Sequence, residues 1–124
     1  MRTVLLVEDS KLVRADRENI LKKAGYLVIT AVDGVEALIL AYESHPDVIL
    51  MDLMLPKLDG ASVLRTLKAD PVTANIPVVV VTALSGKNNE EKLMLDGAAA
   101  FLEKGLLQTS DEPLLYTINK VLQS

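Results

Sequence analysis

The stretch Val48-Ile49-Leu50-Met51-Asp52 decides how the rest of the chain is arranged. Its four consecutive apolar residues predict a strand that is buried on both faces of a sheet. The strand ends on a carboxylate, Asp52, and the chain then leaves through a loop that contains Pro56. In open α/β sheets, ligands bind beyond the carboxyl ends of the strands. We therefore expect Asp52 to carry the chemistry of the protein.

Four further short apolar segments predict strands of the same kind, and helical patterns alternate with them along the chain. The strands are expected over residues 3–7, 27–31, 76–82 and 99–103, and helices over residues 11–24, 34–44, 60–69, a short segment ending at 96–97, and 111–122. Residues 105–110 are expected to form a plain connection. This alternation predicts an α/β fold with a doubly wound, flavodoxin-like, five-stranded parallel sheet of order 2-1-3-4-5 and helices on both faces.

Composition limits the classes of protein to which the chain can belong. Its 124 residues, of which 50% are hydrophobic and 24% charged, suit one globular domain over residues 1–124. The absence of Cys excludes disulfides and thiolate metal sites, and a formal charge of -4 argues against a nucleic-acid surface. No apolar run approaches the roughly 20 residues of a membrane span, and no signal peptide is evident. We expect a soluble, cytoplasmic domain without membrane insertion.

Three helices contain residues that the simple amphipathic pattern does not explain. In the first, Asp16 and Arg17 occupy positions where core residues are expected. We expect Arg17 to bury its aliphatic stem and leave its guanidinium in water; the pattern gives no account of Asp16. The helix over residues 34–44 is apolar almost all round, which favours broad core contact over an exposed patch for a partner. Met94 and Leu95 pose the same question on the fourth helix.

Polar residues follow four of the five predicted strands, and the carboxyl ends of parallel strands share one edge of the sheet. These residues are Glu8, Asp9, Asp52, Thr82 and Lys104. Three neighbouring carboxylates repel one another, and a hard cation such as Mg²⁺ (or Mn²⁺) relieves that repulsion. An ammonium and a hydroxyl suit an anionic oxygen. The set therefore fits a phosphoryl group, which an Asp carboxylate can accept as an acyl phosphate.

With these residues assembled, the chain resembles the receiver domain of bacterial two-component response regulators, including the chemotaxis regulators. The matching motifs are Glu8-Asp9, Asp52-x-x-x-Pro56-x-x-Asp59-Gly60, Thr82-Ala83, Gly97-Ala98 and Lys104. They occur in the order and at the spacing of that family, and they cover nearly all of the chain. The resemblance implies a phosphorelay switch that acts by itself or as part of a larger protein.

The resemblance also implies how the phosphoryl group arrives. Asp52 would accept it from the phosphohistidine of a sensor histidine kinase or phosphotransfer protein. Asp9, Asp52 and the backbone carbonyl of Met54 would ligate Mg²⁺, with Glu8 acting through a water. The chain would catalyse only its own phosphorylation and dephosphorylation, and so would not be an enzyme in the usual sense.

The response to phosphorylation is implied in the same way. Lys104 would bind one phosphoryl oxygen, Thr82 would move to bind another, and Phe101 would change rotamer with it. The face formed by the fourth helix, the fifth strand and the last long helix would then change its affinity for a downstream protein target. Direct contact with nucleic acid is not expected.

The sequence departs from the family pattern at a few positions. Gly105 follows Lys104 where Pro is usual, and because a cis non-proline peptide costs about 3 kcal/mol we expect a trans bond and an altered loop. Phe101 replaces a common Tyr and has no hydroxyl, and plain core packing would also explain it. Met54 and Leu84 lie two positions after Asp52 and Thr82. Being apolar, they cannot orient a water, which predicts slow self-dephosphorylation.

Other functions fit parts of the same pattern. A pseudo-receiver would use the fold as a protein-interaction module without phosphate. A phosphatase with Asp52 as nucleophile would need a second acid two residues later, where Met54 stands. Flavodoxin-like cofactor binding would need a phosphate-cradling loop after the first strand, and the sequence has no Gly-rich or Ser/Thr-rich loop there.

Overall fold

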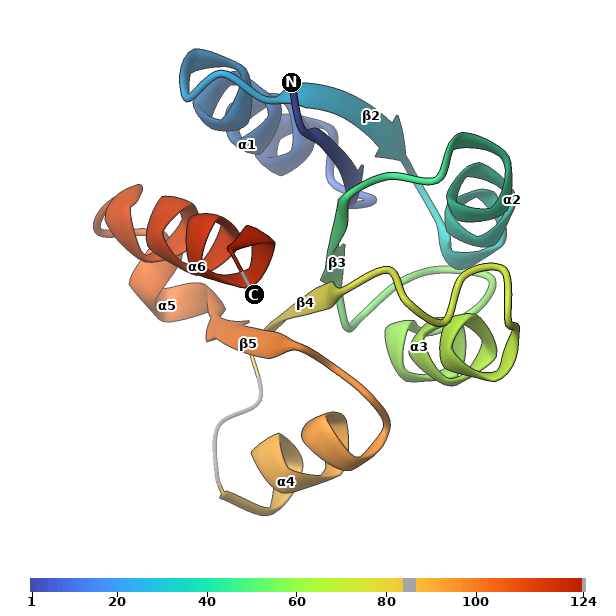
Figure 1. The fold of residues 1–124 in the computed structure, drawn as a ribbon. Helices are drawn as coiled ribbons and strands as arrows, with labels where there is room; N and C mark the ends of the chain where they lie inside the picture. Colours follow the sequence, from blue (N-terminus) through green and yellow to red (C-terminus); the bar gives the residue numbers. More distant parts are fainter. Residues whose placement is uncertain (84–86, 124) are drawn as a thin grey trace.

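The computed structural model describes residues 1–83 and 87–123, except for the side chains of Lys87 and Asn88. Its centre is one parallel sheet of order β2-β1-β3-β4-β5 (Figure 1). The strands are β1 (Thr3–Val7), β2 (Leu27–Ala31), β3 (Val48–Asp52), β4 (Val78–Thr82) and β5 (Ala100–Glu103). The predicted fold class and strand order are confirmed.

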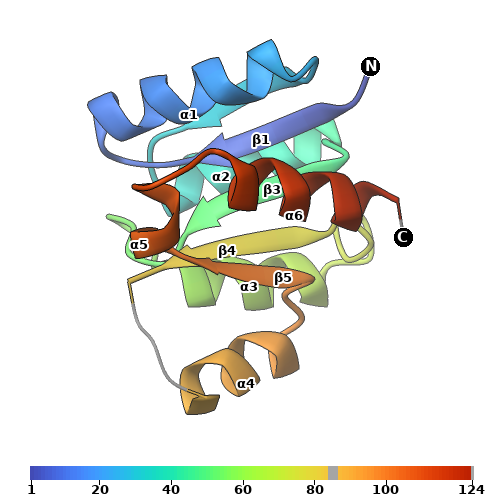
Figure 2. The ribbon, with the colours of Figure 1, turned by 90° about the vertical axis from the view of Figure 1, so that its left-hand side faces the viewer.

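Helices cover both faces of this sheet (Figures 1 and 2). They are α1 (Lys11–Lys23), α2 (Gly34–Ser44), α3 (Gly60–Ala69), α4 (Lys87–Leu95), α5 (Lys104–Leu107) and α6 (Glu112–Leu122). One hydrophobic cluster joins the sheet to α2, α3 and α4, and a second joins its other face to α1 and α6. A doubly wound sheet requires this arrangement because each face of the sheet must be covered.

The two central strands, β3 and β4, explain why their apolar residues follow one another without alternating with polar ones. Every residue of β3 and β4 is buried. Within β3, Ile49 and Met51 belong to the cluster under α2 and α3, while Val48 and Leu50 belong to the cluster under α1 and α6. The core therefore holds the β3 backbone from both sides, which fixes the position of Asp52 at its end.

Hydroxyl and carboxylate caps begin three of the helices that border the site. Ser10 Oγ accepts from Val13 N at 3.4 Å, Asp33 Oδ1 from Glu36 N at 2.8 Å, and Asp59 Oδ1 from Ser62 N at 2.9 Å. Each cap satisfies a donor that the first helical turn leaves free. The backbone hydrogen bond lowers the pKa of Asp33 and Asp59 below the usual range, with smaller help from Lys57 at Asp33 and from Ser62 at Asp59.

The structure differs from the sequence-based prediction at a few places besides one-residue differences at the ends of α1 and α6. The fourth strand begins at Val78, not at residue 76, because Ile76 N bonds Thr73 O in a turn and Pro77 has no N–H for the ladder. The fifth strand begins one residue late, at Ala100. Residues 105–110 were expected to be a plain connection, but α5 occupies its first half and packs Leu107 against the α1–α6 cluster.

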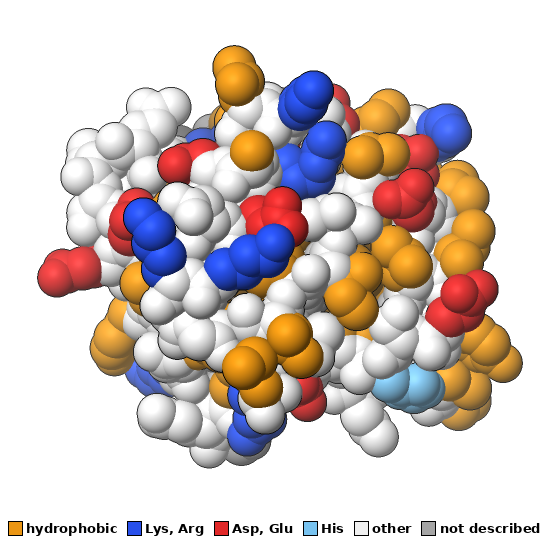
Figure 3. Space-filling model, turned by 90° about the horizontal axis from the view of Figure 1, so that it is seen from above, with side chains coloured by type: hydrophobic (Ala, Val, Ile, Leu, Met, Phe, Trp, Pro, Cys, Tyr) orange, Lys and Arg blue, Asp and Glu red, His pale blue; other side chains and the backbone are white. Residues whose placement is uncertain are grey.

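The helix α2 does not contact the core on all sides, so the prediction of broad core contact is wrong. Ala37 and Ala41 are buried, whereas Val35, Ile39 and Tyr42 are about half exposed. Figure 3 shows hydrophobic side chains gathered on this side of the molecule, near the single histidine. On α4, Met94 and Leu95 are exposed as well. Among the helices that the structure describes, none is long and apolar enough to cross a membrane.

Candidate functional site

Asp52 lies at the centre of the carboxyl edge of the sheet, and its side chain is only 2% exposed. The parallel register places the ends of β1, β3 and β4 side by side at this edge. Asp52 Oδ1 accepts a hydrogen bond from Met54 N at 3.0 Å. Asp52 Oδ2 lies 2.7 Å from Lys104 Nζ. The carboxylate is therefore held from two sides in a fixed orientation.

Two more carboxylates, Glu8 and Asp9, follow β1 and lie beside Asp52. Oxygen atoms of Glu8, Asp9 and Asp52 are within 4.8 Å of one another. Glu8 is buried and Asp9 is exposed, so the group opens to solvent on one side. Hard oxygen ligands that leave room for water are the donor set that Mg²⁺ prefers. The predicted convergence of the three acids is confirmed, and the residues present fit such a cation.

The electrostatic stress of this cluster is concentrated on Glu8. Burial, followed by the hydrogen bond and negative charge of Asp52, raises the pKa of Glu8 to about 7. The Ser10 backbone N–H and the charge of Arg17 oppose this shift. The cluster is thus short of positive charge, and a bound cation would relieve that shortage.

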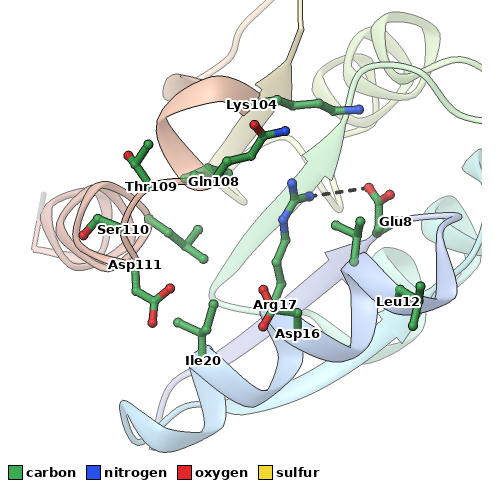
Figure 4. Close-up of a pocket in the computed structure, with 13 residues that line it drawn as sticks. Glu8, Leu12, Asp16, Arg17, Ile20, Lys104, Gln108, Thr109, Ser110 and Asp111 are labelled. Carbon is green, nitrogen blue, oxygen red and sulfur yellow. Dashed lines mark hydrogen bonds and ion pairs between the residues drawn. The ribbon is translucent and has the colours of Figure 1, made fainter.

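Arg17 is a member of the site that the sequence interpretation placed wrongly. Its guanidinium was expected in water, but Arg17 is buried, and its Nη1 lies 3.4 Å from Glu8 Oε2 (Figure 4). Helix α1 turns position 17 inward, where the carboxylate of Glu8 offers a partner that an apolar core would not. The break in the apolar pattern was the available signal. Asp16 on the same turn is exposed, so its carboxylate does not have to be accommodated in the core.

Lys104 reaches Asp52 even though Gly105 replaces the usual Pro. It is the first residue of α5, directly after β5, and its side chain is about one-third exposed. No peptide bond in residues 1–83 and 87–123 is cis, so the expected trans bond after Lys104 is confirmed. The altered loop that was predicted is the short helix α5.

Thr82 and Phe101 occupy different parts of the structure. Thr82 ends β4, one residue beyond the partner of Asp52 in the ladder, and is buried. Phe101 on β5 is half-buried, contacts the cluster under α2 and α3, and lines an open groove of about 640 Å³ with Met94 and Leu95. Thr82 therefore belongs to the acidic edge, whereas Phe101 lies at the surface beneath α4.

The loop after β3 is held close to Asp52. A Cβ on Gly60 would lie 2.7 Å from Asp52 O and 2.8 Å from Leu53 Cα, so only glycine fits this approach. Lys57, with φ 66°, pairs its Nζ with Asp33 Oδ2 at 3.3 Å and fastens the loop to α2. Met54 is 66% exposed beside the acids. Leu84, the other predicted flanking residue, lies outside the residues that the structure describes.

Comparisons with known proteins agree on one family. A profile described as the response regulator receiver domain matches residues 4–112. The polar-differentiation response regulator DivK of Brucella ovis is 40% identical over 103 residues, which are 83% of this chain and 84% of that protein. The receiver domain of the Francisella response regulator 1452 has a TM-score of 0.91 at 29% identity, covering 99% of this chain and 98% of that one.

A second solved structure bears on the acidic cluster. The receiver domain of the sensor histidine kinase PA1611 from Pseudomonas aeruginosa has a TM-score of 0.88 at 29% identity, covering 99% of this chain and 98% of that one. That structure holds a magnesium ion coordinated in its active-site cleft.

Proposed function

The chain belongs to the family of response regulator receiver domains in two-component signalling, and we propose that it is a phosphorylation-controlled switch with Asp52 as phosphoacceptor. The observation that carries this proposal is the setting of Asp52. Its carboxylate is buried at the end of β3, paired with Lys104 at 2.7 Å on one side and clustered with Glu8 and Asp9 on the other. A positioned nucleophile between an ammonium and a cation-binding group is what phosphoryl transfer needs.

Asp9, Asp52 and the backbone carbonyl of Met54 would hold Mg²⁺ or Mn²⁺, with Glu8 acting through a water. Such a cation neutralises negative charge on the phosphoryl oxygens. The magnesium ion in the similar PA1611 receiver domain supports this assignment. The hydrogen bond from Met54 N to Asp52 Oδ1 keeps the loop, and with it the carbonyl, beside the carboxylates.

The transfer itself is a displacement at phosphorus. An oxygen of the Asp52 carboxylate attacks the phosphorus of a phosphohistidine on a sensor kinase or phosphotransfer protein. A P–O bond forms while the P–N bond breaks, and the imidazole nitrogen keeps the electron pair and takes up a proton. Lys104 follows the charge from the Asp52 carboxylate to a phosphoryl oxygen, a shift that its flexible stem allows. The chain would catalyse this change only on itself.

The signal would be passed on through the surface that α4, β5 and α6 form. Thr82 would hydrogen-bond a phosphoryl oxygen and so draw the end of β4 towards Asp52. Phe101, half-buried under α4, would change rotamer in response. The exposed side chains of Met94 and Leu95 border Phe101 and supply apolar contact area for a downstream protein.

A direct experiment tests the phosphoacceptor. The protein is incubated with acetyl phosphate and Mg²⁺, and its intact mass is measured. We expect the mass to rise by one phosphoryl group, and peptide mapping to place that group on Asp52. Chelating the cation should prevent the reaction. An unchanged mass in the presence of Mg²⁺ would instead favour a phosphate-independent interaction module.

A further inference from the structure

The second turn of α1 places a permanent positive charge, that of Arg17, behind the acidic cluster. The side chain of Arg17 is 9% exposed, and its Nη1 lies 3.4 Å from Glu8 Oε2, whose side chain is 4% exposed. Figure 4 shows the guanidinium extending from α1 towards Glu8, with Lys104 on the far side of the cavity. The charge of Arg17 is therefore directed at the same group of carboxylates that would hold a cation.

Arg17 also lines a cavity beside the acidic cluster. This cavity of about 520 Å³ lies between α1 and the α5–α6 segment, and Arg17 and Glu8 both line it. Within residues 1–83 and 87–123, the hydrogen bond to Glu8 is the only one that the Arg17 side chain makes. A guanidinium has five N–H donors, so fold stability alone would call for more partners than one. The interaction with Glu8 is what this residue offers the site.

The acidic cluster is already partly neutralised by two protein cations, Lys104 and Arg17. Lys104 pairs with Asp52 and Arg17 pairs with Glu8, so two of the three clustered carboxylates already face a protein cation. Lys104 lies on the side where a phosphoryl oxygen would be bound, and a phosphoryl group can take over its charge. Arg17 has no such second role, and its charge opposes any cation that approaches Glu8.

We propose that Arg17 is a positioning residue that competes with the divalent cation for Glu8 and thereby weakens cation binding by the acidic cluster. This inference depends on the cation site of the proposed function and adds its regulation. The protein then needs a higher Mg²⁺ concentration before Asp52 can accept a phosphoryl group. Its response to a kinase consequently depends on the Mg²⁺ supply.

Isothermal titration with Mg²⁺ at pH 8.5 tests this proposal. Arg17→Met and Arg17→Gln both remove the charge but differ in polarity. Each should bind Mg²⁺ about tenfold more tightly than the wild type, as removing a partly screened unit charge near the ion predicts. Lys23→Met removes a charge from the exposed end of the same helix and should leave the dissociation constant unchanged.

The outcomes separate this inference from the function on which it depends. Wild-type protein that binds no Mg²⁺ would overturn the proposed cation site itself. Wild-type protein that binds Mg²⁺ while folded Arg17 variants bind within twofold of it, or more weakly, would overturn the role of Arg17. Circular dichroism establishes that the variants are folded.

A measurement on the wild type keeps the proposal testable if the Arg17 variants do not fold. Side-chain NMR resonances of Arg17 should shift as Mg²⁺ saturates the protein, because Glu8 leaves the ion pair. Arg65, whose Nη1 pairs with Asp96 Oδ2 at 3.5 Å and not with any of the three clustered carboxylates, is the internal control. An Arg17 resonance as unresponsive to Mg²⁺ as that of Arg65 would contradict the proposal.

Discussion

The two edges of the sheet use charged side chains in opposite ways. At the amino edge, Asp47 Oδ2 accepts from Thr3 N at 2.7 Å, and Lys68 Nζ donates to Ala74 O at 3.0 Å and Ile76 O at 2.7 Å. Each charged group there binds the backbone of a loop or strand end. At the carboxyl edge, side-chain charges face one another, with Lys104 on Asp52 and Arg17 on Glu8.

The charges at the amino edge stabilise the fold, whereas those at the carboxyl edge prepare the site to bind a ligand. Charges that bind backbone groups satisfy polar atoms that folding has removed from water. Burial lowers the pKa of Lys68. Its ammonium nevertheless donates to two carbonyl groups and so holds the α3–β4 loop in place. At the carboxyl edge, the crowding that raises the pKa of Glu8 to about 7 is stress that a ligand can relieve. Equivalent substitutions at the two edges should therefore have opposite consequences.

The largest contrast is expected between two Asp→Asn substitutions. Asp52→Asn should abolish incorporation of a phosphoryl group from acetyl phosphate, because the amide is no nucleophile. Asp47→Asn should keep incorporation at the wild-type rate but destabilise the fold by about 1–2 kcal/mol, since Thr3 N loses a charged acceptor. Intact mass and urea unfolding measure the two effects. If Asp47→Asn lost phosphorylation while still folded, the division between the edges would be wrong.

A second contrast compares two lysines. Lys104→Met should slow phosphorylation about a hundredfold, the typical cost of losing one electrostatic contact to the transferred group. Lys68→Met should leave the rate unchanged and cost about 1–3 kcal/mol of stability, because two loop carbonyls lose their donor. Rates of mass increase and denaturant midpoints provide the readouts. Equal rate losses in both variants would show that Lys104 acts only through stability.

The sequence could predict the positions of the acids because strand ends follow from hydrophobic runs. Asp52, Glu8 and Asp9 each follow a continuous apolar segment, and parallel topology brings such ends together. Arg17 was misplaced because its partner depends on the direction of a side chain, which periodicity does not contain. The helix α5 was missed because its apolar face is only Leu106 and Leu107, too short a run to show a period.

The roles of the charged residues at the amino edge could not be predicted from the sequence either, for a different reason. Asp47 and Lys68 bind backbone atoms whose positions exist only after the sheet has formed. The outward face of α2 was misjudged because the apolar pattern does not state which side the sheet covers. Sequence reasoning thus reached the residues at strand ends, and it failed where a role depends on packing between elements.

The dependence of stability on pH measures the electrostatic repulsion at the carboxyl edge. The pKa of Glu8 is raised from 4.5 to about 7, so the folded protein binds more protons than the unfolded chain between those values. Without divalent cations, the free energy of unfolding should therefore fall by about 3 kcal/mol at most from pH 4.5 to pH 7 and then level off. Asp33 and Asp59 have lowered pKa values, so their contributions are lost only in stronger acid.

Urea unfolding at a series of pH values, with and without Mg²⁺, provides the measurement. Saturating Mg²⁺ should flatten the decline, because the cation takes over the charge that the proton neutralises. Glu8→Gln should flatten it as well, whatever the absolute stability of that variant. If the free energy of unfolding of Glu8→Gln still fell between pH 4.5 and pH 7, a group other than Glu8 would have the raised pKa.

The smallest expected effect concerns the lifetime of the phosphorylated state. Met54 is 66% exposed at the rim of the site, two residues after Asp52, and its thioether cannot orient an attacking water. Met54→Asn adds an amide at this point, and one neutral hydrogen bond of about 1 kcal/mol would speed loss of the phosphoryl group about fivefold. Met94→Asn makes the same change at an exposed position on α4 and should leave the lifetime unaltered. The lifetime is followed by intact mass after removal of acetyl phosphate. If Met54→Asn and the wild type lose the group equally fast, the carboxyl edge controls transfer to Asp52 but not its reversal.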